Sequence, residues 1–349
     1  MVRKILVAVV AIMVIVGVCV FAFQLGPAEA QAASVNSAII ATEESTMPDD
    51  SSQTVASGII QKLSDTQFNP GDIYLEKQWA IENMGLAALW AVTTGSPEII
   101  VAVLDTGIDK DHEDLSGQIV GEVNFTDSST VDDIYGHGTH IAGIIAAKSN
   151  DIGIVGIAPD VRLLNVKVVN DRGRCQVSDL VEGIIWAVDN GADVINISIE
   201  ISEPSSAMED AVKYAWDNGV IIVAAAGNGG SQIPVYPAFY DNCLAVAAVN
   251  ESDNLAPLSN TGSWVDLAAP GYKIYSTFPG NEYKLETGTS FATAQVSGIA
   301  ALLFTIAVDS NMDGFLNDEI LTIINESCQD IGLDGVGWGC IDAAQIVVS

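Results

Sequence analysis

Apolar and polar residues alternate in blocks along most of the chain, and the blocks predict strands and helices in turn. Four short, nearly continuous apolar runs lie at residues 98–104, 161–168, 193–199 and 220–226. Segments of helical character lie at residues 139–147, 178–190 and 206–218, and Gly219 closes the last of them. Apolar strands without alternation, separated by helices, indicate a parallel sheet that is covered on both faces. We therefore expect an α/β fold with a doubly wound, mostly parallel sheet, in a single domain over residues 67–349.

A further helix is predicted directly after Ser290. Residues 291–304 carry almost no charge, so this helix should be buried on nearly all sides. Gly288 permits a close backbone approach, and Thr289 or Ser290 could cap the helix. A serine among the unpaired N–H groups of a helix N-terminus suits a hydroxyl that must attack a carbonyl. An ordinary serine cap on a core helix is the alternative.

The first 66 residues read as targeting and linker sequence. Arg3 and Lys4 precede an apolar run at residues 5–23, and Ala28-Glu29-Ala30 is a small-x-small cleavage site. We expect a signal peptide over residues 1–30, although the run is also long enough for an uncleaved membrane anchor. Residues 31–66 are polar and indicate a linker or a short pro-segment. On either interpretation the folded part lies outside the cytoplasm.

The chain is strongly acidic, which restricts its partners. Lys and Arg number 13 against 45 Asp and Glu, for a formal net charge of −32. Nucleic acids and anionic membrane surfaces are therefore unsuitable partners. The acidity fits a surface solvated in salty water or one that collects cations, and composition alone does not choose between them.

Five cysteines are present, and Cys19 lies in the targeting run. In an oxidising compartment the other four, which are Cys175, Cys243, Cys328 and Cys340, allow three pairings. Cys328 and Cys340 are close in sequence, so we expect a bridge there first.

Candidate chemistry gathers where strands end. The first apolar run leads directly into Asp105, and the fourth leads into Gly227 and Asn228, which offers two amide N–H donors. Ligands of such sheets bind at the carboxyl ends of the strands. His137, between two glycines at the start of a helix, can act there as a base. Taken alone, Asp105 could equally form an Asx-turn.

The other two histidines are expected to have structural or solvated roles. His112 lies in the polar loop after Asp109, and His140 lies one turn into the helix after His137.

Four motifs in the order Asp, His, Asn, Ser carry a resemblance to a known family. They are Asp105-Thr106-Gly107, Gly136-His137-Gly138-Thr139-His140, Ala225-Ala226-Gly227-Asn228 and Gly288-Thr289-Ser290-Phe291-Ala292. Together they resemble the subtilisin-like serine peptidases, or subtilases, from about residue 78 to residue 347. The resemblance implies a monomeric serine endopeptidase that cleaves polypeptides.

The resemblance also implies roles for individual residues. Ser290 would be the nucleophile, His137 would take and return its proton, and Asp105 would fix the imidazole tautomer. Asn228 and the Ser290 backbone N–H would form the oxyanion hole. Ser198 and Gly227 would flank the bound peptide as an added strand.

The same resemblance places the pocket for the residue before the scissile bond. Its expected lining comprises Ser198, Ile199, Glu200, Ala226, Gly227 and Val235. Glu200 and Val235 stand where the family commonly has glycine. We expect preference for medium aliphatic residues such as Leu or Met, tolerance of Lys or Arg, and poor cleavage after Phe or Tyr. The alternative is a broad hydrophobic preference with Glu200 turned to solvent.

A structural calcium ion is the one cofactor expected. By resemblance its ligands would be Asp114 and Asn150 side chains, the carbonyls of Lys148, Ile152 and Ile154, and Gln78, all oxygens as calcium requires. A surface loop with an Asn turn is the alternative.

A second loop, at residues 309–317, begins like an EF-hand, but Ile320 occupies the twelfth position and the carboxylate falls early, at Glu319. We therefore expect a polar helix-entry loop there, with Asn317 as the cap.

The chain departs from the family pattern after the nucleophile, where Ala294 and Gln295 replace the usual Pro and His. These changes should alter packing at the helix start without loss of activity. Residues 31–66 are also too few for the usual folded pro-domain.

A catalytically silent binding module on the same scaffold is the competing function. An α/β-hydrolase esterase is disfavoured, since its nucleophile normally lies in a G-x-S-x-G elbow.

Overall fold

The computed structural model describes residues 68–348, which belong to the compact unit Leu63–Ser349. The expected signal peptide or anchor at residues 1–30 and the linker at 31–66 lie outside the described residues. Over residues 68–348, none of the helices combines the length and apolar character needed to cross a bilayer.

A nine-stranded sheet forms the centre of the described part of the chain, in the order β10-β11-β7-β6-β5-β4-β1-β3-β2. Its strands are β1 (Ile100–Asp105), β2 (Ile119–Asn124), β3 (Arg162–Lys167), β4 (Val194–Ile197), β5 (Ile221–Ala225), β6 (Cys243–Val249), β7 (Leu267–Pro270), β10 (Cys328–Gln329) and β11 (Cys340–Ile341). All its pairings within the described residues are parallel except that of β10 with β11. This arrangement confirms the expected α/β class.

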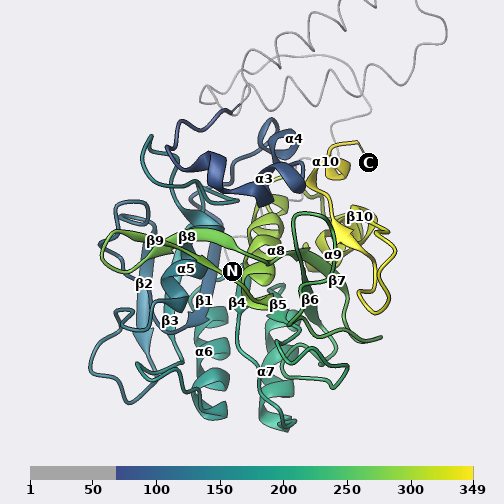
Figure 1. The fold of residues 1–349 in the computed structure, drawn as a ribbon. Coiled ribbons are helices and arrows are strands. Elements are labelled where there is room, and N and C mark those ends of the chain that lie inside the picture. The colour runs from purple at the N-terminus through teal and green to yellow at the C-terminus, as the bar shows by residue number, and fades with distance from the viewer. Residues whose placement is uncertain (1–67, 349) are drawn as a thin grey trace, which may run out of the picture. The chain divides into compact units, whose positions relative to one another are not determined.

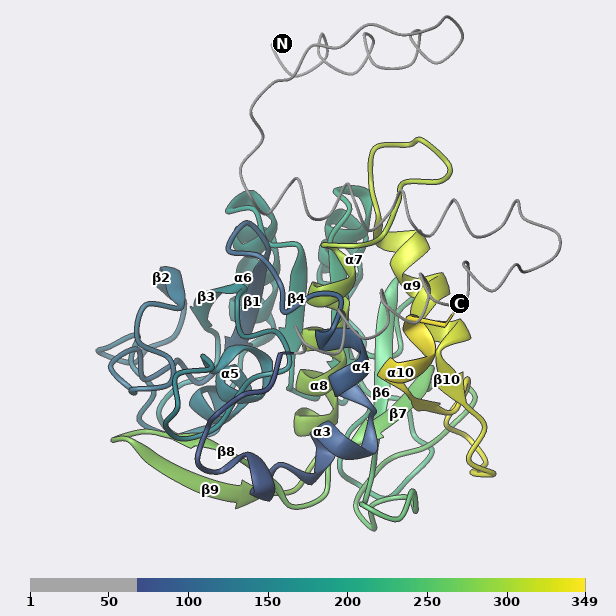
Figure 2. The same ribbon diagram turned by 90° about the horizontal axis from the view of Figure 1, so that it is seen from above.

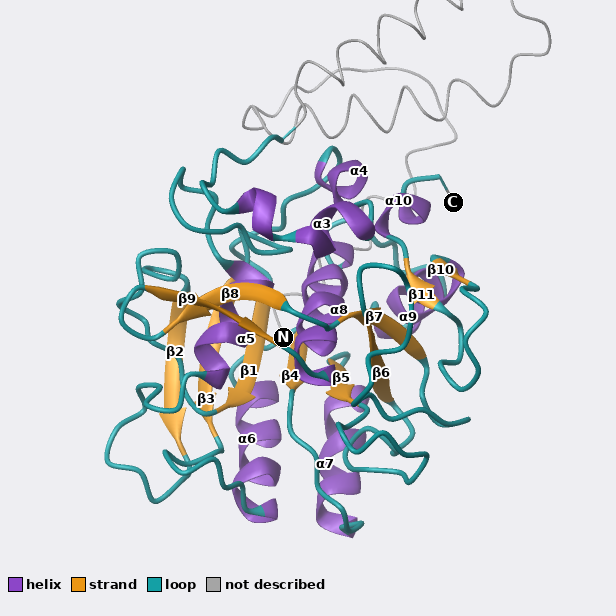
Figure 3. Cartoon of the chain, in the orientation of Figure 1, coloured by secondary structure: helices purple, strands orange, loops and turns teal. Residues whose placement is uncertain are grey.

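Helices cover both faces of the sheet (Figure 1; Figure 3). They are α3 (Trp79–Asn83), α4 (Leu86–Trp90), α5 (His137–Ala146), α6 (Val177–Asp189), α7 (Ser206–Asp217), α8 (Thr289–Leu303), α9 (Asn317–Glu326) and α10 (Ala343–Ile346), with a 3₁₀ turn at Leu75–Lys77. Figure 2 shows α5 and α8 on one side of the strands and α6 and α7 on the other.

The central strand β1 shows how the sequence produces these two layers. Val101 and Val103 join the core cluster that contains α5 and α8, whereas Ala102 and Leu104 join the cluster that contains α6 and α7. Successive side chains of a strand point to opposite faces, so a strand buried twice must be apolar at every position. The doubly wound arrangement expected from the unalternating runs is thus confirmed.

The order of the strands reverses at β1, which pairs with β3 on one side and β4 on the other. A crevice for ligands forms at the carboxyl ends of strands at such a point. The hairpin of β8 (Ile274–Phe278) and β9 (Glu282–Glu286) lies over α5, where Ser276 and Thr277 hydroxyls donate to the carbonyls of His140 and Thr139, at 2.8 and 2.7 Å.

The expected disulfide between Cys328 and Cys340 is absent from the structure. All four cysteines among the described residues are free. The register pairs Cys328 with Ile341 and Gln329 with Cys340, so the two thiols belong to successive, opposite-facing positions of a short antiparallel ladder. The expected bridge, which was based on the short sequence separation of the two cysteines, is therefore not formed in this structure.

Candidate active site

Asp105 lies at the carboxyl end of β1 and is 1% exposed. Its Oδ1 accepts a hydrogen bond from the Thr106 backbone N–H at 2.7 Å. Both carboxylate oxygens also face the Nδ1 atom of His137, at 2.8 Å for Oδ1 and 2.9 Å for Oδ2. The predicted strand end thus delivers the carboxylate to a histidine, and the lone Asx-turn interpretation is incomplete.

His137 is the first residue of α5, two residues earlier than the predicted helix start. Gly136, with φ of 102°, makes the left-handed turn before it. Gly138 follows, and a Cβ there would lie 2.1 Å from the Gly107 carbonyl oxygen, so only glycine allows this approach. The two glycines that flank His137 therefore bring the helix start against the end of β1.

The contacts of the His137 imidazole with Asp105 shift its pKa. Burial lowers its pKa, but the charge of Asp105 and its hydrogen bond outweigh this effect, and the pKa lies above the ordinary value. Asp133 and Glu286 add to the rise. With the proton on Nδ1 directed at Asp105, Nε2 is left as the acceptor.

Ser290 lies in the first turn of α8 and is 6% exposed. Its hydroxyl donates to the Ser198 carbonyl at 3.2 Å, while the Ser198 hydroxyl donates to the Ser290 carbonyl at 3.0 Å. The described residues show no hydrogen bond between Ser290 and His137, although the His137 ring lies 5.6 Å from the ring of Phe291. Gly288, which has no side chain, occupies the N-cap, so the expected Thr289 or Ser290 cap is wrong.

Asn228 follows β5 and reaches the same helix start. Its Oδ1 accepts from the backbone N–H of Thr289 at 2.9 Å and from the Thr289 hydroxyl at 3.2 Å. With the amide oxygen committed to Thr289, the two N–H donors of the side chain are directed elsewhere. The ends of β1 and β5 and the starts of α5 and α8 therefore carry a carboxylate–imidazole pair, a hydroxyl at a helix N-terminus and an amide donor.

Comparison with known proteins shows the family of the chain. The Subtilase family model matches residues 96–339. The chain belongs to the subtilase family. Its matched domain is that of a serine-type endopeptidase.

Individual relatives agree with the family assignment. The subtilase domain is 43% identical over 244 residues to a thermophilic serine proteinase of Bacillus sp. (strain AK1), over 69% of this chain and 61% of that protein. It is 42% identical over 239 residues to thermitase of Thermoactinomyces vulgaris, over 68% of this chain and 85% of the relative. It is 43% identical over 210 residues to subtilisin DY of Bacillus licheniformis, over 59% and 76%.

The expected pocket of the subtilase domain has Glu200, Gly227 and Val235 close together. A Cβ built on Gly227 would lie 2.6 Å from Glu200 Oε2 and 3.3 Å from Val235 Cγ2. Glu200 is an exposed residue, yet its Oε2 accepts from the Asn228 backbone N–H at 3.0 Å, so this oxygen is held at the rim. Val235, expected to take up volume in the floor, and Glu200, expected to add a carboxylate at the rim, thus both lie against Gly227.

The remaining lining residues come from two neighbouring strand ends. Ser198 and Ile199 follow β4, and an Ile201–Tyr236 bridge joins this wall to the segment that carries Val235. Asn260 was missed from the sequence, although its side chain donates to the Ala226 carbonyl at 2.9 Å and accepts from two backbone N–H groups, those of Gly229 and Ser231. Asn260 therefore fixes the loop that contains Gly227 and Asn228.

The residues expected to bind calcium in the subtilase domain also come together. Asp114 is fully buried; its Oδ1 accepts from the Asn150 side chain at 3.2 Å and its Oδ2 from the Ile154 backbone N–H at 2.9 Å. Gln78 bonds to both backbone groups of Val155, at 2.7 and 3.1 Å. No group of three or more His, Cys, Asp or Glu side chains over residues 68–348 is arranged to hold a metal.

One carboxylate beside this loop was missed. Asp72 is 4% exposed and accepts from the Asn150 backbone N–H and the Ser149 hydroxyl, both at 3.0 Å. Burial raises the pKa of both Asp72 and Asp114. Asp72 lies distant in sequence from the loop, so no local pattern could have found it.

The loop at residues 309–317 leads into α9, as expected, but Asn317 does not cap that helix. Asn317 is its first residue, and its side chain donates to the Trp216 carbonyl at 3.2 Å. Glu319 instead reaches back, accepting from the backbone N–H and the hydroxyl of Ser310, each at 2.9 Å. The Asn317 side chain, which was expected to cap α9, instead forms a tertiary hydrogen bond to Trp216.

The two remaining histidines lie inside the structure. His112 and His140 are both fully buried, and their Nε2 atoms lie 3.1 Å from the carbonyls of Glu282 and Lys284. Burial lowers the pKa of His140 to about 3, so this ring is neutral. Both contacts tie the β8–β9 hairpin to the body of the domain.

Proposed function

We propose that the protein is a secreted serine endopeptidase that cleaves polypeptides through an acyl-enzyme. The observation that carries this proposal is the His137 Nδ1 atom held 2.8 and 2.9 Å from the Asp105 carboxylate. The ring of this histidine lies 5.6 Å from that of Phe291, which directly follows Ser290 in the first turn of a buried helix. Family membership of the domain supports the chemistry.

The mechanism follows from the partners of each group. The Ser290 hydroxyl turns from the Ser198 carbonyl toward His137, whose Nε2 accepts its proton while Oγ attacks the substrate carbonyl. Asp105 keeps the tautomer fixed and stabilises the imidazolium that forms. The Asn228 amide N–H and the backbone N–H of Ser290 donate to the oxyanion. His137 then returns the proton to the leaving amine.

Reaction with a fluorophosphonate probe tests this proposal. The mature wild type should be labelled, and Ser290→Ala, which lacks the nucleophile, should not. A wild type that folds but takes no label would leave the silent binding module as the better account. N-terminal sequencing of the exported form would decide between cleavage near residue 30 and an uncleaved anchor.

We further propose that a structural calcium ion binds at the loop of residues 148–154. Asp114 and Asn150 would hold it with side-chain oxygens, and Lys148, Ile152 and Ile154 with carbonyl oxygens. Two buried carboxylates, those of Asp114 and Asp72, lie beside this loop, and neither forms an ion pair with Lys or Arg among the described residues. Since a buried charge needs compensation, the donor set fits a hard cation.

A further inference from the structure

A second acidic residue lies behind the candidate active site. Asp133 lies four positions before His137, in the segment between β2 and α5, and is 4% exposed. Its carboxylate accepts five hydrogen bonds. The donors are the Thr106 hydroxyl (2.8 Å), the Tyr135 and Gly136 backbone N–H groups (3.0 and 2.7 Å), and the backbone N–H and hydroxyl of Thr139 (2.9 and 2.8 Å).

These hydrogen bonds involve backbone N–H groups on both sides of His137 in the sequence, at Gly136 before it and at Thr139 after it. Gly136 occupies the N-cap of α5 and has no side chain to satisfy the first N–H groups of the helix. Asp133 supplies the missing acceptor from outside the helix, at the end where a negative charge is favoured. The backbone before and after His137 is therefore held by one carboxylate.

Thr106 connects this carboxylate to Asp105. Its hydroxyl donates to Asp133 and accepts from the backbone N–H of Gly138 at 2.9 Å. Thr106 directly follows Asp105, and Gly138 directly follows His137. The chain segments that carry the two catalytic candidates are thus joined through one hydroxyl, which is 2% exposed as a residue and anchored by Asp133.

Three carboxylates act electrostatically on His137. They come from β1 (Asp105), from the loop before α5 (Asp133) and from the end of β9 (Glu286). His140, one turn along α5, is neutral, with its pKa lowered to about 3 chiefly by burial. Asp133 is the carboxylate of the three that is buried without touching the imidazole.

We propose that Asp133 is a positioning residue for His137, which fixes the imidazole against Asp105 and adds negative charge that favours the imidazolium formed during proton transfer. This inference rests on the proposed function, because it assigns Asp133 a part in the same reaction.

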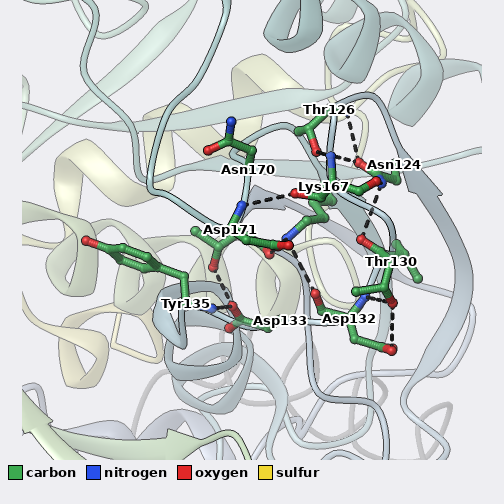
Figure 4. A network of polar contacts seen from close by, with 12 residues as sticks. Asn124, Thr126, Thr130, Asp132, Asp133, Tyr135, Lys167, Asn170 and Asp171 are labelled. Atoms are coloured by element: carbon green, nitrogen blue, oxygen red, sulfur yellow. Dashed lines mark hydrogen bonds and ion pairs between the residues drawn. The ribbon is translucent and has the colours of Figure 1, made fainter.

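The neighbouring acid provides a matched control. Asp132 is exposed, and its Oδ2 accepts from the Thr130 hydroxyl at 2.7 Å. In Figure 4, Asp133 lies beside the backbone of Tyr135, whereas Asp132 lies on the side of Thr130. Replacing either acid by its amide removes one charge from the same segment, but only Asp133 is bonded to the backbone around His137.

The experiment compares the pH dependence of kcat/KM for the wild type, Asp133→Asn, Asp132→Asn and Thr106→Val, on the mature protein with a soluble peptide substrate. An amide has one acceptor oxygen, so Asp133→Asn cannot satisfy both sets of donors. We expect kcat to fall about tenfold with KM nearly unchanged, and the acidic limb to move to lower pH. Asp132→Asn should match the wild type in both respects.

Thr106→Val leaves every charge in place and breaks the link between the two segments. We expect a fall in kcat with the acidic limb unmoved, and this variant decides the positioning role if Asp133→Asn does not fold. Wild-type kcat in Thr106→Val, or an acidic limb moved as far by Asp132→Asn as by Asp133→Asn, overturns the inference. Failure of the proposed function is distinguishable, because the wild type would then take no fluorophosphonate label at all.

Discussion

At the scale of single residues, the orientation of the Asn228 side chain leads to a prediction about turnover. Its Oδ1 accepts from Thr289, so in the proposed mechanism its N–H donors face the developing oxyanion. We expect Asn228→Ala to lower kcat by about a hundred- to a thousandfold with KM little changed, as loss of such a donor does in subtilisin.

The isosteric variant Asn228→Asp sharpens this prediction. It keeps an oxygen for Thr289 but has no N–H to donate, so it should be at least as impaired as Asn228→Ala. Asn218→Ala, an exposed amide beyond the end of α7, is the control. Steady-state kinetics that showed Asn228→Asp near wild-type turnover would remove Asn228 from the oxyanion hole.

A second residue-scale prediction concerns the side chain accepted before the scissile bond. Val235 and Glu200 both approach the single glycine of the pocket. Val235→Gly should raise cleavage after Phe and Tyr relative to Leu by about tenfold, because the pocket gains volume. Glu200→Gln keeps the shape of the rim and removes its charge, so cleavage after Lys and Arg should fall by a few-fold at most.

Profiling the variants on a peptide library measures both effects at once. Glu200→Gln is the matched partner of Glu200→Gly, which also loses the hydrogen bond to the Asn228 backbone. Unchanged aromatic cleavage in Val235→Gly together with unchanged basic cleavage in Glu200→Gln would show that the pocket lies elsewhere.

At the scale of elements, the loop of residues 148–154 between α5 and β3 carries the calcium prediction. Binding to the folded state alone raises stability according to ligand concentration and affinity. The melting temperature should therefore rise by several degrees on addition of calcium and fall with a chelator, whereas magnesium at equal concentration should do less. Differential scanning calorimetry measures all three.

Two variants locate the effect within the chain. Asp114→Asn should abolish the response to calcium, and Asp313→Asn, in the loop before α9, should leave it intact. The reverse outcome would assign the ion to the loop at residues 309–317, and a melting temperature indifferent to calcium would leave neither site.

Much of the fold could be predicted from residues in sequence because the central strands are apolar throughout and end in recognisable turns. The boundaries differ by at most two residues, as between residues 98–104 and β1 at Ile100–Asp105. The strands β10 and β11 have two residues each, and β9 is largely exposed, so none of the three shows a hydrophobic pattern. These elements exist through tertiary pairing.

The candidate site divides in the same way. Asp105, His137, Asn228 and Ser290 could be found because each stands at the start or end of a regular element. Asp133 and Asp72 could not, since each is an acid in a polar segment and its partners are backbone N–H groups or hydroxyls. A sequence does not display which loop a buried carboxylate will face.

At the scale of the whole molecule, acidity and burial together predict how stability depends on pH. Burial outweighs a backbone hydrogen bond at both Asp193 and Asp266 and raises each pKa from 3.8 to about 6. Between these values the folded state holds protons that the unfolded chain has released, so the free energy of unfolding falls as pH rises through this window. A net charge of −32 adds repulsion in the same direction.

We expect the melting temperature to fall by several degrees between about pH 4 and pH 7, at fixed calcium, because unfolding releases the protons that the two acids hold over this interval. Asp193→Asn should flatten part of this dependence, and Asp210→Asn, exposed on α7, should not. A melting temperature that rose over the same interval would contradict the assignment of these two acids.

The position of α8 late in the chain determines when the candidate active site can be assembled during synthesis. This helix packs against β4, β5, β6 and β7 and carries Ser290, whereas Asp105 and His137 lie far upstream in the chain. Contacts between residues so distant in sequence form late in folding, because the long loop between them must close at a cost in entropy. A polypeptide still emerging from the ribosome thus contains His137, the base of the proposed mechanism, before it contains Ser290, the proposed nucleophile. The proposed protease is harmless to its own synthesis for as long as its last third is missing.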